Sequence, residues 1–327
     1  MKWVTVRRQD DERPGLVIDD AIHVLPGTDQ LIDLLGDEGG KLANAGELAQ
    51  QKPAEVVGYA EADLAAPLRP TQIRDTLLFL QHLKNARGGA ELEPEWSQIP
   101  AFYFGNTASI TGPNDPVEIF PGSEWFDCEL EVASIIGRQG SSLHPDEAED
   151  YIAGFMIFND WSARDLQQKE LVLNIGQGKG KDGANTFGPM FVTRDELEPY
   201  RSGNSYSLKA EAYVNDEKFG EGTLDQMDWT FGEVVSFASR GTKLMPGDAI
   251  CSGTVPTCCL VEHFAVAMAQ SLAPGDGDQP PPPDSNQENF RGWLQPGDVV
   301  RLEVELLGSQ QQEVLPSISV HRLRSGY

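Results

Sequence analysis

The sequence predicts a mixed α+β fold that is rich in strands. Several short apolar or alternating runs end at turn residues, which is typical of strands. Asp19-Asp20 and Asn215-Asp216 each separate two such runs, as in a β-hairpin. Pro246-Gly247-Asp248 and Pro296-Gly297-Asp298 each precede another apolar run, a turn-then-strand pattern. Helical patterns are fewer and short, so we expect sheets to form most of the fold.

Residues 1–70 are predicted to form a small N-terminal domain, and residues 71–327 a larger one. In the first unit, strands at 16–18 and 21–25 precede helical patterns at 28–36, 44–51 and 53–64, the last of which opens with a proline. Pro67 and Pro70 mark the boundary. Near the other end, four prolines at 280–283 lie among acidic and polar residues, which predicts a disordered insertion at about 270–289.

The stretch 125–137 carries the first candidate site residues. It has the apolar and β-branched composition of a strand, with no interior Gly or Pro. Side chains two apart on a strand share a face, so Glu129 and Glu131 point the same way, about 6.5 to 7 Å apart along the backbone. Two interpretations stay open. The carboxylates lie on a solvated strand edge, or they bind a hard cation such as Mg²⁺ or Ca²⁺, because unpaired buried carboxylates are costly.

A third acid follows the next predicted strand, at 152–158. Asp160 comes where that apolar run stops, and the segment 162–165, Ser-Ala-Arg-Asp, fits the Ser-x-x-acid pattern of a helix start. Arg164 and Gln167 are three residues apart and share one face of the expected helix. This strand-to-helix corner carries an acid, a guanidinium and an amide, which favours a binding site.

Two other motifs are ambiguous when taken alone. The apolar run 73–85 is predicted to be helical, and a lone histidine in such a run, here His82, is more often a packing residue than a functional one. The loop 176–183 is rich in glycine. It lacks the strand-loop-helix context and the spacing of a nucleotide-binding loop, so we do not expect nucleotide binding.

Composition excludes some classes of partner. The chain of 327 residues has 51 Asp and Glu against 25 Lys and Arg, a formal net charge of −26. Nucleic acids and anionic membranes require a basic surface, so neither is an expected partner. The start of the chain has no signal-peptide pattern, no run has the length of a membrane helix, and the four cysteines lack zinc or disulfide spacing. We therefore expect a cytoplasmic protein with reduced thiols.

Taken together, the motifs resemble the fumarylacetoacetate hydrolase family, especially its fumarylacetoacetase-type bacterial members. The resemblance rests on Glu129-Leu130-Glu131, on the nonapeptide 159–167, and on the segment 179–182 ahead of Gly188-Pro189. It spans about residues 70–310. It implies a β roll in the C-terminal region, a smaller N-terminal α/β domain and a homodimer.

The resemblance also implies a metal site with a general base beside it. The implied ligands of Mg²⁺, Ca²⁺ or Mn²⁺ are Glu129, Glu131, Asp160 and Asp75. The last is assigned because it stands seven residues before His82, which corresponds to the general base of the family. Glu262 lies in a segment similar to the one whose glutamate pairs with that histidine.

Further positions correspond to residues that hold the substrate or its developing negative charge. They are Arg164, Gln167, Lys181, Tyr103 and Thr254. Tyr103 fits a core tyrosine nearly as well. Leu77 stands where fumarylacetoacetase has a substrate-binding tyrosine, which argues against fumarylacetoacetate itself as the substrate.

The expected function is therefore that of an enzyme with a small keto acid as substrate. By resemblance it is a metal-dependent hydrolase that cleaves a carbon-carbon bond in a β-diketo acid of the fumarylacetoacetate or acylpyruvate type, in aromatic compound catabolism. A first alternative is decarboxylation, isomerisation or dehydration of a 2-oxo acid through the same metal-stabilised enolate. A second is a non-catalytic metal-binding β domain, and the joint presence of His82, Glu262, Arg164 and Lys181 argues against it.

Overall fold

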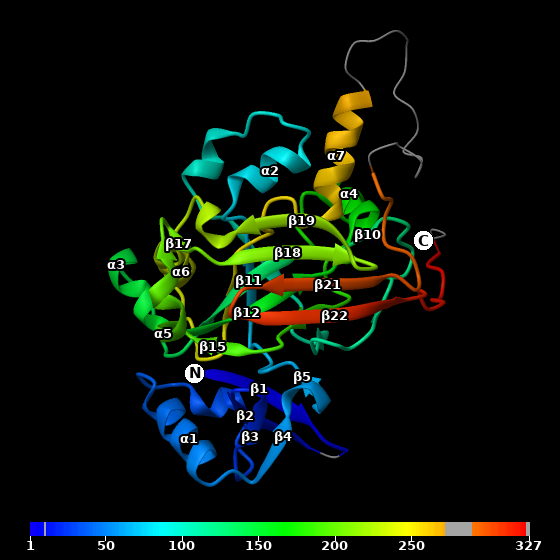
Figure 1. Cartoon of the computed structure of the whole chain (residues 1–327). Helices are drawn as coiled ribbons and strands as arrows, with labels where there is room; N and C mark the ends of the chain where they lie inside the picture. Colours follow the sequence, from blue (N-terminus) through cyan, green and yellow to red (C-terminus); the bar gives the residue numbers. More distant parts are fainter. Residues whose placement is uncertain (10, 272–289, 325–327) are drawn as a thin grey trace.

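The computed structural model describes residues 1–9, 11–271 and 290–324. The insertion predicted at 270–289 therefore lies outside the described residues except for its first two positions. The prediction of a mixed α+β, strand-rich fold is confirmed. A large sheet and a smaller one pack against each other, and short helices lie around them (Figure 1).

The large sheet passes through the whole molecule. In spatial order it contains β4 (Glu55–Gly58), β3 (Ala21–Val24), β2 (Glu12–Ile18), β1 (Lys2–Arg7), β15 (Phe191–Thr193), β12 (Ile152–Asp160), β11 (Leu130–Ile136), β20 (Ala249–Cys251), β6 (Ile73–Thr76) and β7 (Phe102–Gly105). Three short strands pair beside this path: β5 (Leu64–Ala65), β8 (Ile110–Thr111) and β14 (Asn185–Phe187).

The smaller sheet covers one face of the large one. Its order is β19 (Glu217–Thr223), β18 (Lys209–Val214), β21 (Val299–Val304), β22 (Gly308–Leu315) and β9 (Val117–Glu118). Two further pairs join β10 (Phe126–Asp127) to β13 (Ser162–Ala163), and β16 (Arg201–Ser202) to β17 (Ser205–Tyr206). The α-helices are α1 (Gly40–Gln51), α2 (Leu80–Ala86), α3 (Pro145–Ala148), α4 (Arg164–Val172), α5 (Arg194–Leu197), α6 (Phe231–Ser239) and α7 (Leu260–Ser271).

The central strands β11 and β12 are buried on both faces, which explains their nearly continuous apolar sequence. Val132 and Ile157 belong to the core between the two sheets. Their neighbours Ala133 and Phe158 belong to a second core on the opposite face, which includes residues of α1. Alternation with a period of two therefore assigns each side chain of these strands to one of two cores.

The same alternation places the acids. Glu131 shares its face with Ala133, and Asp160 shares its face with Phe158, so both point toward the side of the second core. β20 pairs with β11, and β6 runs parallel to β20 with Asp75 opposite Cys251. The three acids thus come from neighbouring strands, near the same end of the sheet.

Some local predictions are confirmed and others are wrong in the N-terminal region. The hairpin at 16–18 and 21–25 is present as β2 and β3. Residues 53–64 do not form a helix: they form β4, a 3₁₀ turn at Tyr59–Glu61 and β5. Val56 and Val57 pair with β3, so edge pairing of β-branched residues overrides the helical pattern. The helix expected at 28–36 is only a 3₁₀ turn at Leu31–Leu34.

Two elements near the candidate site also differ from prediction. The run 73–85 was predicted to be helical throughout, but its first four residues form β6 and the helix begins only at Leu80. The strand expected at 125–137 is interrupted at residues 128–129, because β10 turns away to pair with β13. The hairpin at Asn215-Asp216 is confirmed, and both residues have positive φ, as a tight hairpin turn requires.

The N-terminal strands are continuous with the large sheet, because β1 pairs with β2 on one side and with β15 on the other. In Figure 1 these strands and α1 lie at the bottom of the molecule, away from α2 and α7. The domain boundary at residues 70 and 71 stays a prediction. Within the described ranges, none of the helices is both long enough and apolar enough to cross a membrane.

The junction of β1 with β15 yields a stability prediction. Trp3 pairs with Phe191 across it, and its side chain is fully buried. We expect Trp3→Ala to lower the free energy of unfolding by about 3–5 kcal/mol, because it removes a large buried side chain and leaves a cavity. Val56→Ala, on the exposed face of β4, should change it by no more than about 0.5 kcal/mol. Urea titrations followed by circular dichroism measure both, and equal effects would contradict this role of Trp3.

Candidate active site

Buried acids gather at one end of the large sheet. Oxygens of Glu129, Glu131 and Asp160 lie within 4.8 Å of one another, a grouping that could hold a metal ion. Asp75 joins Glu131 and the Cys251 thiol in a second group with the same spacing. Each of the four carboxylates is at most 4% exposed. The structure thus brings together all four predicted ligands. Because they are buried, the interpretation that they lie on a solvated strand edge is wrong.

Two cations contact this cluster on one side. Arg164 donates from Nη2 to Glu129 Oε1 at 2.5 Å, and the Lys181 ammonium donates to both Glu129 and Asp160. Burial acts to raise the pKa of Glu129, but Arg164 and Lys181 outweigh burial and hold that pKa well below its ordinary value. Tyr103, from β7, donates its hydroxyl to Asp160 Oδ2 at 2.6 Å. Because Arg164 and Lys181 both contact Glu129, this carboxylate is ionised and its charge is paired.

The other three carboxyls are compensated less completely, since Asp160 contacts Lys181 but Glu131 and Asp75 contact neither cation directly. Burial first, and then the neighbouring carboxylates Asp75 and Asp160, raise the pKa of Glu131 well above its ordinary value. Burial also raises the pKa of Asp75, and it raises that of Asp160 well above normal despite the opposing effect of Lys181. Oδ1 of Asp75 and Oδ1 of Asp160 are buried without a hydrogen-bond partner. Negative charge on these three groups needs a further positive partner.

A divalent cation fits these residues. The donors are carboxylate oxygens, which suit Mg²⁺, Ca²⁺ or Mn²⁺, and two of the oxygens have no other partner. Burial first, and then Asp75, raise the pKa of the Cys251 thiol well above its ordinary value, so the soft donor stays protonated. All four cysteines are buried and free, as the prediction of reduced thiols requires.

A histidine-carboxylate pair lies beside this cluster. His82 Nδ1 is 2.7 Å from Glu262 Oε1, and both side chains are buried. Glu262 also accepts from Asn85 Nδ2 at 2.5 Å, from the Thr257 backbone N–H at 2.9 Å and from the Cys259 thiol at 3.4 Å. An acceptor at Nδ1 fixes the proton on that nitrogen, which leaves Nε2 with its lone pair. The arrangement is that of an oriented general base.

The two halves of this pair come from different helices that pack together, α2 with His82 and α7 with Glu262 (Figure 1). Glu129 pairs in an isolated β-bridge with Cys259, and the Cys259 thiol contacts Glu262, so the pair of His82 and Glu262 lies next to the carboxylate cluster. The predicted base and the predicted metal ligands therefore form one site.

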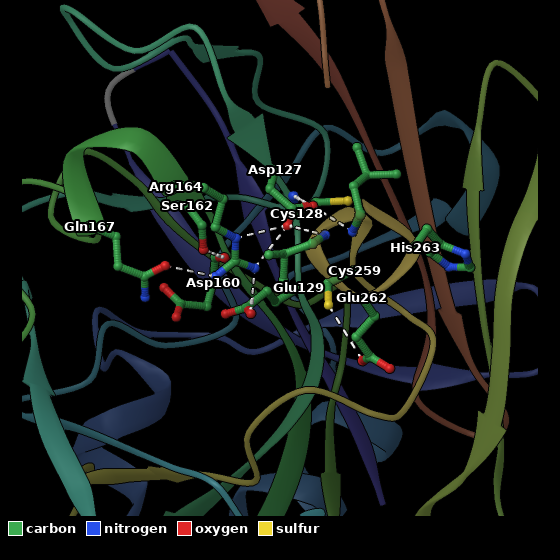
Figure 2. A network of polar contacts seen from close by, with 12 residues as sticks. Asp127, Cys128, Glu129, Asp160, Ser162, Arg164, Gln167, Cys259, Glu262 and His263 are labelled. Atoms are coloured by element: carbon green, nitrogen blue, oxygen red, sulfur yellow. Dashed lines mark hydrogen bonds and ion pairs between the residues drawn. The ribbon is translucent and has the colours of Figure 1, made fainter. Parts of the chain in front are cut away.

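Helix α4 supplies a guanidinium and an amide to the cluster. Arg164 Nη1 donates to Gln167 Oε1 at 3.1 Å, which confirms that the two share a helix face. Figure 2 shows Arg164 between Glu129 on one side and Asp127 on the other. The predicted cap by Ser162 is wrong, because Ser162 is paired in β13 and its hydroxyl donates to the Asp160 carbonyl. The Asp165 carboxylate instead accepts from Ser123 and from the Glu124 backbone.

The loop after β20 closes the other side. Gly253 donates its backbone N–H to Glu131 Oε2 at 3.0 Å. Its φ is +74°, and an added Cβ would lie 2.4 Å from the Thr76 carbonyl oxygen, so this close approach requires glycine. The hydroxyl of Thr254, a predicted substrate contact, is buried next to it without a partner.

Asp127 is the buried acid that sequence reasoning missed. Its side chain is fully buried and pairs with Arg164 Nε at 2.9 Å. The pattern Asp127-x-Glu129-x-Glu131 has the period of two that identified the two glutamates, so the signal was present. Thr257 and Cys259, which contact Glu262, had no comparable signal, because the loop that carries them is not visible in local sequence. Asn85, which also contacts Glu262, lies three residues after His82 on α2.

Comparison with known proteins identifies relatives of this chain. A family model described as fumarylacetoacetate (FAA) hydrolase C-terminal matches residues 72–315. The 2,4-didehydro-3-deoxy-L-rhamnonate hydrolase of Sphingomonas sp. (strain SKA58) is 29% identical over 215 residues, which is 66% of this chain and 65% of that protein. The mitochondrial oxaloacetate tautomerase of Xenopus laevis is 29% identical over 208 residues, 64% of this chain and 56% of that protein. The chain thus spans less than two thirds of either curated relative.

A solved structure extends the likeness to the whole fold. The fumarylacetoacetate hydrolase from psychrophilic Exiguobacterium antarcticum superposes with a TM-score of 0.73, covering 97% of this chain and 99% of that one at 24% identity. At this identity the likeness shows a common fold, which includes the N-terminal strands.

The raised pKa values predict an unusual pH dependence of stability. An acid whose pKa is higher in the folded chain than in the unfolded one stabilises the fold at low pH, and this contribution is lost as pH rises through the folded pKa. With chelator present, we therefore expect thermal stability to fall as pH rises above the ordinary carboxyl range near 4, through the raised pKa values of Glu131, Asp75 and Asp160.

Glu131→Gln provides the comparison for this experiment, because it removes one of the three titrating groups with little change in shape. Melting temperatures of both proteins are measured between about pH 5 and pH 8 with a chelator. The variant should lose less stability over this range than the wild type. Parallel curves for the two proteins would contradict the raised pKa of Glu131.

Proposed function

The chain belongs to the fumarylacetoacetate hydrolase family, and from this premise we propose that it is a metal-dependent hydrolase of β-diketo acids. It would cleave a carbon-carbon bond in a substrate of the fumarylacetoacetate or acylpyruvate type. The observation that carries the proposal is the buried pair of His82 and Glu262 beside the carboxylate cluster. A site for an ion alone has no use for an oriented base.

The proposed metal ligands are Glu129, Glu131, Asp160 and Asp75. A divalent cation held there would supply Lewis-acid stabilisation to the enol or keto oxygens of the substrate. The carboxylates are already gathered by the pairing of β6, β20, β11 and β12. We therefore expect binding to release protons from carboxyls with raised pKa, without a rearrangement of strands.

His82 acts as the general base of the proposed reaction. Its Nε2 takes a proton from water, and the resulting hydroxide adds to the distal carbonyl of the substrate. Glu262 keeps the Nδ1 proton in place and stabilises the charged imidazole, while Asn85 and the Thr257 N–H hold the Glu262 carboxylate. Collapse of the adduct breaks the carbon-carbon bond and releases one fragment as an acid and the other as an enolate, which is then protonated.

Positively charged groups close to the carboxylates would stabilise the enolate and bind the substrate carboxylate. Lys181 is buried, and burial, which would lower its pKa, is outweighed by Asp160 and Glu129, so the ammonium stays charged. We assign Lys181 to the developing negative charge, and Gln167, Tyr103 and Thr254 to substrate binding. The donors of Arg164 are engaged by Asp127, Glu129 and Gln167, so we assign Arg164 to the orientation of Glu129 and Gln167.

The relatives support a second candidate within the same chemistry. The Sphingomonas relative is named a hydrolase, whereas the Xenopus relative is named an oxaloacetate tautomerase. In tautomerisation, isomerisation or decarboxylation the same base would move protons without adding water to a carbonyl. The homodimeric assembly, the cytoplasmic location and the place in aromatic compound catabolism stay predictions.

Replacing the base tests the mechanism directly. We expect His82→Ala to lower kcat by about 10²- to 10⁴-fold with Mg²⁺ supplied, because a general base contributes rate enhancement of this order. His144→Ala is the matched control, since His144 is exposed and lies at the start of α3. Loss of ultraviolet enol absorbance across acylpyruvates, fumarylacetoacetate and oxaloacetate measures the rate. Near-wild-type hydrolysis by His82→Ala would exclude it as the base.

Product analysis separates the two candidate reactions. In water enriched in ¹⁸O, hydrolysis yields two carbon fragments, and the acid formed by cleavage carries one solvent oxygen. Mass spectrometry of the products detects that label. Released carbon dioxide, or an isomer of unchanged composition, would instead support the second candidate.

A further inference from the structure

One fully buried carboxylate connects the two halves of the site. Asp127 ends β10, and its oxygens accept hydrogen bonds from both backbone and side-chain donors. The backbone N–H of Cys128 and that of Leu260 reach Oδ1 at 2.8 and 2.7 Å. The backbone N–H of Val261 and Nε of Arg164 reach Oδ2 at 3.0 and 2.9 Å.

On one side, Asp127 contacts the start of helix α7. N–H groups in the first turn of a helix have no partner within the helix, and Leu260 and Val261 are the first two residues of α7. A carboxylate from β10, more than 130 residues earlier in the chain, satisfies both. Glu262 is the next residue along, so this cap sets the position from which its side chain reaches His82.

On the other side, Asp127 contacts Arg164. Its Nη2 lies 2.8 Å from Asp127 Oδ2 and 2.5 Å from Glu129 Oε1, so one guanidinium connects the two acids. The planar fork of an arginine fixes both partners at once. Figure 2 shows Asp127 and Glu129 on either side of Arg164, and also Cys259, which directly precedes α7, and Glu262 in the first turn of that helix.

From these contacts we infer that Asp127 is a positioning residue that holds the helix bearing Glu262 in register with Arg164 and Glu129. The inference rests on the proposed function, because it assigns Asp127 to act through the pair of His82 and Glu262. Asp127 itself contacts neither of those side chains. Because Asp127 acts through the helix that carries Glu262, we expect its loss to lower the rate rather than the substrate affinity.

Asp127→Asn tests the inference in the Mg²⁺-loaded full chain with the acylpyruvate that it hydrolyses fastest. The amide keeps the shape but converts one oxygen into a donor, so either the α7 cap or the pairing with Arg164 is lost whichever way it turns. We expect kcat to fall by about 100-fold, the cost of a misplaced catalytic group, while KM changes by less than about threefold.

A matched control distinguishes positioning from general loosening. Asp248 is also fully buried, and it pairs with Arg74 Nη1 at 3.2 Å and with Thr71 Oγ1 at 2.6 Å, outside the proposed machinery. Asp248→Asn should lower the melting temperature and leave kcat unchanged. Wild-type kcat in Asp127→Asn, or an equal loss of kcat in both variants, would overturn the inference.

A double-mutant cycle identifies the route of the effect. If Asp127 acts through Glu262, the double variant of Asp127→Asn with Glu262→Gln is no slower than the slower single variant. If the loss of kcat in the double variant equals the product of the two single losses, the inference is overturned. Wild-type activity in Glu262→Gln would overturn the proposed base together with it, whereas loss of activity in Glu262→Gln beside a normal Asp127→Asn would overturn the inference alone.

If Asp127→Asn fails to fold, a pair of substitutions at Leu260 gives the same test. Leu260→Pro and Leu260→Ala both remove the buried side chain, but only proline also removes the N–H that Asp127 accepts. Proline is well tolerated at the first position of a helix. We expect kcat of Leu260→Pro to be about tenfold below that of Leu260→Ala, and equal values would overturn the inference.

Discussion

Six carboxylates are buried at one end of the large sheet, and among the described residues two permanent cations, Arg164 and Lys181, are buried with them. The acids are Asp75, Asp127, Glu129, Glu131, Asp160 and Glu262. A buried charge costs several kcal/mol unless it is paired and hydrogen-bonded. Backbone N–H groups and Arg164 satisfy Asp127, the two cations satisfy Glu129, and donors from α2 and from the loop before α7 satisfy Glu262. Asp75, Glu131 and Asp160 remain, and a divalent cation would compensate their negative charge.

The fold can hold this charge because the sheet fixes where each acid points. Period-two alternation turns Glu131 and Asp160 toward one face, and the parallel pairing of β6 with β20 adds Asp75 from a strand that is distant in sequence. The helices that follow β6 and β20 then carry His82 and Glu262 to the same end. The base and the proposed ligands are close because neighbouring strands end together.

Sequence alone predicted the residues whose role follows from local geometry. Glu129, Glu131 and Asp160 could be found because alternation and the end of an apolar run are visible in the chain itself. Asp75 and Glu262 required a family resemblance, since the run containing Asp75 has a helical pattern and only pairing with β20 makes it a strand. Asp127 shares the alternation of the two glutamates, but its place in the site depends on its contacts with Arg164 and with the start of α7, which only the folded chain shows. Tertiary pairing decides the roles of Asp75, Glu262 and Asp127, and the local sequence does not show which segments pair.

The central claim is that carboxyls with raised pKa form the divalent-cation site. Calorimetric titration of Mg²⁺ at neutral pH, in two buffers with different heats of ionisation, counts the protons released on binding. The account predicts release of about one proton or more per ion bound, and a smaller number in Glu131→Gln, because Glu131 must lose its proton to become a ligand. Binding without proton release, or release that is unchanged in Glu131→Gln, would contradict it.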